Sequence, residues 1–147
     1  MRAVVTRVKS ASVEIDGSIY SSIDSGLLVL LGVHQEDTEA EALKIADKLC
    51  GIRIFEDENG KMNVNPLDAG AKMLIISQFT LFADCKSRRP GFSKAARPDT
   101  AIPLYEMVIA KCREKGFEVQ TGIFAADMQV ASVNDGPVTI ILDTKEL

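Results

Sequence analysis

The sequence predicts an α+β fold, in which largely antiparallel, barrel-like β-sheets carry about two helices within a single domain spanning residues 1–147. Short β-prone runs separated by turn dipeptides fill most of the chain. Apolar residues recur at helical spacing in only two stretches, at about 38–51 and 100–115. No internal repeat or linker divides the chain. Its 147 residues, 46% of them hydrophobic, are enough to bury one core without disulfides or a metal.

Three strands are predicted in the first 34 residues. Apolar residues alternate up to Ile15, and Asp16-Gly17 is a strong signal for a two-residue hairpin that returns through residues 18–23. Ser25-Gly26 then turns the chain into the uninterrupted apolar run 27–33. A strand that is apolar on both faces needs a covering layer on each side.

The remaining elements follow from caps and turns. Thr38 and Glu41 form a capping box for a helix that Gly51 ends. The second helix begins at Thr100 or Pro103 and ends at Lys115. The other predicted strands are 52–55, 62–64, 72–82, 117–120 and a final pair, 128–133 and 138–142.

The charge pattern is uneven. The formal net charge of −4 argues against unselective coating of nucleic acid, yet Cys85 to Pro98 holds no acidic residue. Five basic residues lie in this segment: Lys86, Arg88, Arg89, Lys94 and Arg97. They predict either a solvated loop or a contact with phosphate groups.

The cysteines and the N-terminus indicate a cytoplasmic protein. Cys50, Cys85 and Cys112 are odd in number and widely spaced, which is typical of reduced thiols. We expect no signal peptide and no membrane-spanning segment.

Few side chains are available for chemistry. His34 is the only histidine, and we expect it to have a structural or solvent role at an exposed strand end. The motifs of zinc proteases, serine hydrolases and phosphate-binding loops are missing. The acidic run at 56–58 is expected to be a solvated turn. Catalysis would therefore depend on hydroxyls, amides and backbone groups, which suits a substrate with a good leaving group.

Two short stretches concentrate such groups. SQFTL at 77–81 ends the apolar strand that begins at 72, and NDGPVT at 134–139 interrupts two β-prone runs. Pro137 cannot donate to a sheet ladder, so a hairpin turn, a bulge or an edge is expected there. A simple hairpin turn is the structural alternative to a functional role.

Together these stretches resemble the two signature motifs of the D-aminoacyl-tRNA deacylase family. The similarity extends to four further segments: RAVVTRVKSASVEIDG at 2–17, GLLVLLGV at 26–33, FEDENGKMN at 55–63 and FAADMQVASVNDGPVT at 124–139. The resemblance implies hydrolysis of D-aminoacyl-tRNA to a free D-amino acid and tRNA, a proofreading step of translation. It also implies a homodimer with active sites at the interface, and no metal or organic cofactor.

The resemblance assigns roles to residues of this sequence. Gln78, Phe79 and Thr80 would be catalytic, chiefly through backbone N–H groups. Thr80 is the one hydroxyl that could be a nucleophile, but no base stands ready to activate it, so attack by water is preferred. The substrate would also be bound by five further residues: Ser77, Ala101, Met128, Gly136 and Pro137.

In this family the Gly136-Pro137 peptide is cis and reaches into the partner's site. Its carbonyl groups would exclude an L side chain, and glycyl-tRNA, with no side chain, would partly escape this filter. Lys86, Arg88 and Arg89 would contact tRNA. Gly91 departs from the serine that is usual after the proline in this loop, which leaves the loop's hydrogen bonding open.

Two other function classes stay open. A non-catalytic RNA-binding module would explain the basic loop, but with 5% aromatic residues we expect no exposed aromatic pair for stacking bases. A small-molecule hydrolase or deaminase at a dimer interface would not explain the basic segment.

Overall fold

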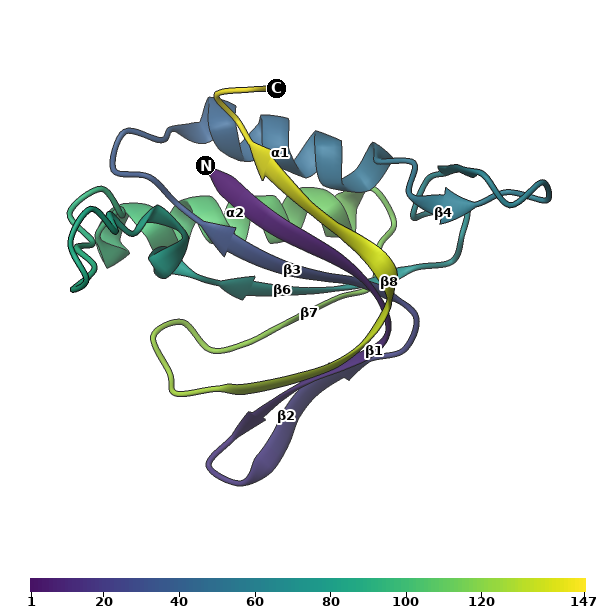
Figure 1. Ribbon diagram of the computed structural model, residues 1–147, viewed down its shortest axis with the longest axis horizontal. Helices are drawn as coiled ribbons and strands as arrows, with labels where there is room; N and C mark the ends of the chain where they lie inside the picture. The colour runs from purple at the N-terminus through teal and green to yellow at the C-terminus, as the bar shows by residue number, and fades with distance from the viewer.

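The computed structural model describes residues 1–147 as one bent, mixed sheet with two helices on one face (Figure 1). The helices are α1 (Glu39–Gly51) and α2 (Pro98–Glu114), with the 3-10 helix η1 (Phe79–Phe82) between them. The main strands are β1 (Arg2–Ile15), β2 (Ser18–Ile23), β3 (Gly26–Gly32), β6 (Lys72–Ser77), β7 (Val119–Thr121) and β8 (Gln129–Asp143). A separate hairpin consists of β4 (Phe55–Glu56) and β5 (Met62–Val64). The predicted barrel-like α+β fold with two helices is confirmed. Neither α1 nor α2 has the length and hydropathy that a membrane-spanning helix requires.

The long strand β1 bends the sheet. β8 pairs with it from Arg2 to Glu14, whereas β3 pairs with its first half and β2 with its second half. The second half therefore folds back over β6 and β7 (Figure 1). The Ser21 hydroxyl of β2 donates a hydrogen bond of 2.7 Å to the Thr121 carbonyl of β7. This contact nearly closes the sheet into a barrel.

The sheet is less antiparallel than predicted. β3 pairs with β6, and β6 with β7, in parallel. The reason is the connection between them: residues 33–71 include α1 and residues 78–118 include α2, and a helical crossover returns the chain in the same direction. As a result, the carboxyl ends of β3 and β6 lie at one edge of the sheet.

Two predicted strand boundaries are wrong. The strand predicted at 72–82 ends at Ser77, after which the chain turns into η1. The strands predicted at 128–133 and 138–142 are one strand, β8, which stays paired with β1, so the hairpin turn does not form. The alternative expectation of a bulge or an edge fits, because the register is irregular opposite Thr6 to Ser10. β8 pairs with β1 alone, so Pro137, which has no N–H, occupies an edge strand. The Gly136-Pro137 peptide is cis.

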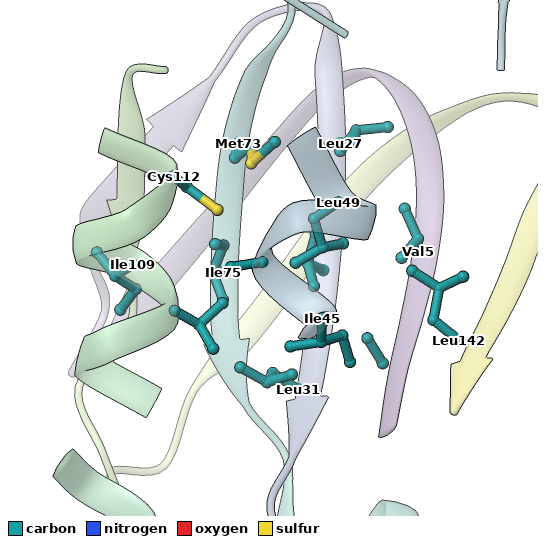
Figure 2. Packing of buried hydrophobic residues seen from close by; sticks show 14 of the residues in the cluster. Val5, Leu27, Leu31, Ile45, Leu49, Met73, Ile75, Ile109, Cys112 and Leu142 are labelled. Atoms are coloured by element: carbon teal, nitrogen blue, oxygen red, sulfur yellow. The ribbon is translucent and has the colours of Figure 1, made fainter. Parts of the chain in front are cut away.

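The core has two parts because β3 and β6 are apolar on both faces, as predicted. Leu27, Leu31, Met73 and Ile75 face the helices and pack against residues such as Ile45, Leu49, Ile109 and Cys112 (Figure 2). Leu28, Leu74 and Ile76 face the other way, against Val8, Val13 and Ile23 of the folded-back strands.

Local signals were accurate where one turn or cap decides the structure. Asp16 and Gly17 have φ of 51° and 79°, which is the left-handed geometry of the predicted hairpin. At the start of α1 the Thr38 N–H donates to the Glu41 carboxylate at 2.6 Å, which confirms the capping box. All three cysteines are free, although Sγ of Cys50 and Sγ of Cys112 lie 3.7 Å apart.

Candidate active site

A pocket of about 550 Å³ lies where β6 ends, and its size suits a small-molecule ligand. Three segments line it: the end of β6 and the start of η1, the start of α2, and the loop before β8. The lining residues are Ile76, Ser77, Gln78, Phe79, Ala96, Pro98, Phe124, Ala125, Ala126, Asp127, Met128 and Val130. The walls are thus mostly apolar, with polar groups gathered at the strand end.

Backbone N–H groups are the distinctive feature of that strand end. The Gln78 N–H still donates to the Leu31 carbonyl of β3 at 2.8 Å. The first 3-10 hydrogen bond runs from the Leu81 N–H to the Gln78 carbonyl at 3.3 Å, so the N–H groups of Phe79 and Thr80 precede the helical hydrogen bonds. Such groups can stabilise negative charge that develops on a carbonyl oxygen.

The Thr80 hydroxyl is already engaged. It accepts a hydrogen bond of 2.6 Å from the Gln78 amide nitrogen. His34 does not line the pocket. A nucleophilic role for Thr80 would need a general base, and the one acidic side chain that lines the pocket is Asp127.

The β6 strand beneath the pocket is held by Tyr105 of α2. Its hydroxyl donates a hydrogen bond of 2.7 Å to the Ile75 carbonyl. Burial raises the pKa of Tyr105, so the phenol stays protonated and remains a donor across the physiological range. Tyr105 therefore fixes the strand that carries the polar residues of the pocket.

The structure brings together only some of the predicted site residues. Ser77, Gln78, Phe79 and Met128 line the pocket, and Thr80 is exposed beside them. Ala101 lies on α2 and is buried in the core. Gly136 and Pro137 are exposed on β8 and do not line this chain's pocket.

Arg7, which the sequence did not mark as a site residue, holds the segment before the Gly136-Pro137 peptide. Its guanidinium is buried and donates to the Asp135 carbonyl at 3.0 Å and to the Ile54 carbonyl at 2.7 Å. It also lies 3.3 Å from the Asp135 carboxylate. An arginine that alternates with valines on a strand resembles an exposed residue, so the pattern gave no signal of these contacts. Phe124 and Asp127 were missed as well, although they lie in the FAADMQV segment.

The basic loop is ordered by its own backbone. Asp84 and Gly91 exchange two N–H···O bonds of 2.7 and 2.9 Å. Gly91 therefore leaves the loop's backbone hydrogen bonding intact. The loop's five basic residues form no ion pair within the chain, which leaves their charges available: Lys86, Arg88, Arg89, Lys94 and Arg97.

Two sequence-based expectations about rings are wrong. Phe79 and Phe92 are both exposed and pack edge to face, with ring centroids 5.1 Å apart, so an aromatic pair does lie between the pocket and the basic loop. His34 is not at an exposed strand end: it is 8% exposed and packs against Phe82 at 5.1 Å. Composition counts rings but cannot show which of them the fold brings together.

Comparison with known proteins decides the family. The model of the family described as D-Tyr-tRNA(Tyr) deacylase matches residues 4–143. The chain belongs to this family. A D-aminoacyl-tRNA deacylase from Thermus aquaticus is 52% identical, over 99% of this chain and 97% of the relative. One from Koribacter versatilis is 54% identical, over 99% of both chains.

Solved structures agree with the family assignment. The c-Myc DNA Unwinding Element Binding Protein matches with a TM-score of 0.92 at 39% identity, covering 97% of this chain and 98% of that one. A probable eukaryotic D-amino acid tRNA deacylase matches with a TM-score of 0.81 at 16% identity, which supports the fold alone. The predicted resemblance to the deacylase family is confirmed. The prediction of an enzyme of the deacylase type, rather than a non-catalytic RNA-binding module, is confirmed as well.

Proposed function

We propose that this chain hydrolyses the ester bond of D-aminoacyl-tRNA, releasing the free D-amino acid and tRNA, and that it does so in the cytoplasm during translation. The observation that carries the proposal is the pocket at the end of β6, where the N–H groups of Phe79 and Thr80 precede the helical hydrogen bonds. Family membership supplies the substrate class.

In the proposed reaction, water attacks the ester carbonyl carbon. The N–H groups of Phe79 and Thr80 hold the resulting oxyanion. The bond between the carbonyl carbon and the ribose oxygen then breaks, and that oxygen takes a proton relayed through the neighbouring ribose hydroxyl. Because the ester is already reactive, this stabilisation can suffice without a histidine base.

RNA would approach over the basic loop. The unpaired charges of Lys86, Arg88 and Arg89 suit phosphate groups, and the exposed faces of Phe79 and Phe92 suit a stacked terminal base. Such contacts orient the 3′ end without reading the rest of the sequence.

Selection against L-aminoacyl-tRNA is assigned to Gly136 and Pro137 of a second copy of the chain. Both residues are exposed on an edge strand and lie outside their own pocket, which leaves them free to enter a partner's. Exposed apolar residues on the same strand, Val133 and Ile141, support a homodimer. Glycyl-tRNA has no side chain for this filter to exclude, so it is a further substrate of the enzyme.

Single-turnover hydrolysis of matched D- and L-aminoacyl-tRNAs tests the activity. We expect release of the D-amino acid and of glycine, and slow release of the L-amino acid. Asp127→Asn tests whether the attack proceeds without a side-chain base: a loss of about a thousandfold would show that the carboxylate acts as a general base.

A mixing experiment tests the shared site. Ser77→Trp should block a chain's own pocket. Gly136→Val should disrupt the Gly136-Pro137 segment that the chain inserts into its partner's pocket. Each variant alone is expected to be inactive. Dissociated and reassociated mixtures should regain activity, because one site of each mixed dimer carries neither change. Mixtures as inactive as the parents would contradict a site built from two chains.

A further inference from the structure

A second, smaller pocket lies at the opposite end of η1 from the active-site pocket. Its volume is about 140 Å³, and Arg2, His34, Phe82, Lys94, Asp143 and Lys145 line it. The start of β1, the ends of β3 and β8 and the basic loop meet there, at the end of the sheet where Figure 1 shows the N-terminus. The volume is well below the roughly 300 Å³ of a typical ligand site, so it suits a small group and not a whole nucleoside.

The pocket carries uncompensated positive charge. Arg2 is neutralised by Asp143, with a nitrogen–oxygen distance of 2.9 Å, and the N-terminal ammonium by Asp37 at 2.8 Å. The side chains of Lys94 and Lys145 have no carboxylate partner and are exposed. Two exposed ammonium groups without a carboxylate partner therefore line the pocket, whereas its other charges are paired.

His34 adds a fixed donor. Its Nδ1 accepts a hydrogen bond of 3.2 Å from the Glu36 N–H, so the proton of the neutral ring is on Nε2. The edge of the ring packs against Phe82, which fixes its orientation. Nε2 finds no acceptor within the chain, and no buried polar side-chain atom lacks a partner, so Nε2 is open to the pocket that His34 lines.

We propose that this pocket binds a phosphodiester group of the RNA strand whose 3′ end enters the active-site pocket. The inference rests on the proposed function and deepens it. Phe79 lines the active-site pocket and Phe82 lines the small one, and a 3-10 helix rises about 2 Å per residue. Phe79 and Phe82 are therefore about 6 Å apart along η1, which is on the scale of one nucleotide. The lysines and His34 Nε2–H would hold a phosphate on the Phe82 side.

One arm of the test uses the only histidine as a probe. Inorganic phosphate is titrated into the wild-type protein while the imidazole signals of His34 are followed by NMR, with chloride at equal ionic strength as the reference. We expect a saturable shift with phosphate that the double variant Lys94→Gln/Lys145→Gln loses. No saturable shift with phosphate would overturn the anion site.

The other arm separates RNA from free phosphate. For D-aminoacyl-tRNA we expect Lys94→Gln/Lys145→Gln to raise KM about tenfold and to lower the slope of log KM against log salt by about one unit. For 3′-(D-aminoacyl)adenosine, which has no phosphate, KM should not change. The control Lys48→Gln/Lys61→Gln removes the same charge from exposed sites elsewhere.

Each outcome then has one meaning. Equal effects of the two double variants on tRNA would show bulk electrostatics and overturn the proposal. Saturable phosphate binding with an unchanged KM for tRNA would show that RNA is not the ligand. If the wild-type protein hydrolyses neither D-aminoacyl-tRNA nor the phosphate-free ester, the proposed function itself is wrong.

Discussion

At the scale of single residues, the candidate site depends on atoms that a sequence pattern hardly marks. The groups with catalytic potential are the backbone N–H groups of Phe79 and Thr80, and any residue type could present them. The side chains act by holding this backbone in place: Gln78 binds the Thr80 hydroxyl, and Tyr105 binds the strand beneath. Substitutions should therefore change rates in proportion to how far they move the backbone.

Thr80→Ala should reduce deacylation only modestly. The variant loses the hydrogen bond from Gln78 but keeps its own N–H. We expect a loss of about 1 kcal/mol, or about fivefold to tenfold in single-turnover rate. Thr80→Ser keeps the hydroxyl and serves as the control. A folded Thr80→Ala enzyme slowed by a thousandfold or more would identify the hydroxyl as the nucleophile.

Arg7→Lys should destabilise the protein and impair the Gly136-Pro137 segment. A lysine cannot reach the carbonyl groups of Asp135 and Ile54 together, so a buried polar group loses its partner. We expect a decrease of about 2–4 kcal/mol in the free energy of unfolding, measured with urea. The exposed Arg53→Lys is the control. Equal stability of the two variants would contradict this role.

At the scale of elements, the accuracy of prediction depended on how local the deciding interaction is. The hairpin at Asp16-Gly17 and the cap at Thr38 involve neighbours in sequence, and both were predicted correctly. The parallel pairing of β3 with β6 joins segments separated by a crossover, and the continuity of β8 depends on pairing with β1. Residues near Gly136 look like a turn until that partner strand is known.

Several residues of the candidate site are adjacent in the chain, so a sequence motif can mark them together. Ser77, Gln78 and Phe79 line one pocket since they follow one strand. Arg7 and the exposed pair of Phe79 with Phe92 were missed, because only the folded chain brings these residues together. A sequence pattern marks groups along one segment but not the contacts between segments.

Gly32→Ala should disturb the connection between β3 and η1. A Cβ atom at Gly32 would lie 2.9 Å from the Gln78 carbonyl oxygen and 3.1 Å from Cβ of Leu81, so η1 must shift. We expect about 1–3 kcal/mol of destabilisation and a loss of at least about tenfold in rate. Gly51→Ala, where a Cβ would meet nothing within 4 Å, is the control. Wild-type activity of Gly32→Ala would show that η1 tolerates displacement.

Replacing Arg88 and Arg89 with glutamine should weaken tRNA binding and flatten its dependence on salt. Neither side chain pairs with a carboxylate in the chain, so phosphate contacts are the interactions that would be lost. Affinity measured across a salt series checks this, and the preference for D over L substrates should not change. An unchanged affinity and slope would mean that the loop is only solvated.

At the scale of the whole molecule, one face of the sheet builds the core and one edge, β8, is left open to association. The helices cover one face and complete the larger core (Figure 2). β8 leaves one edge unpaired, and its exposed apolar side chains include Val133 at 58% and Ile141 at 69%. An edge strand with such residues is prone to association. A symmetric dimer would cover these exposed side chains and would bring Gly136 and Pro137 of each chain to the pocket of the other.

Val133→Glu tests this arrangement for the whole assembly. A carboxylate on β8 would be buried without a partner at the proposed interface, so we expect the protein to become monomeric by light scattering. Activity on D-aminoacyl-tRNA should fall with it, because a lone pocket lacks the partner's Gly136 and Pro137. Leu43→Glu places the same charge at an exposed apolar position on α1 and should remain dimeric and active. A monomeric Val133→Glu protein that still hydrolyses D-aminoacyl-tRNA and rejects the L substrate would show that each chain holds a complete site, and the role assigned to β8 would then belong to its own chain.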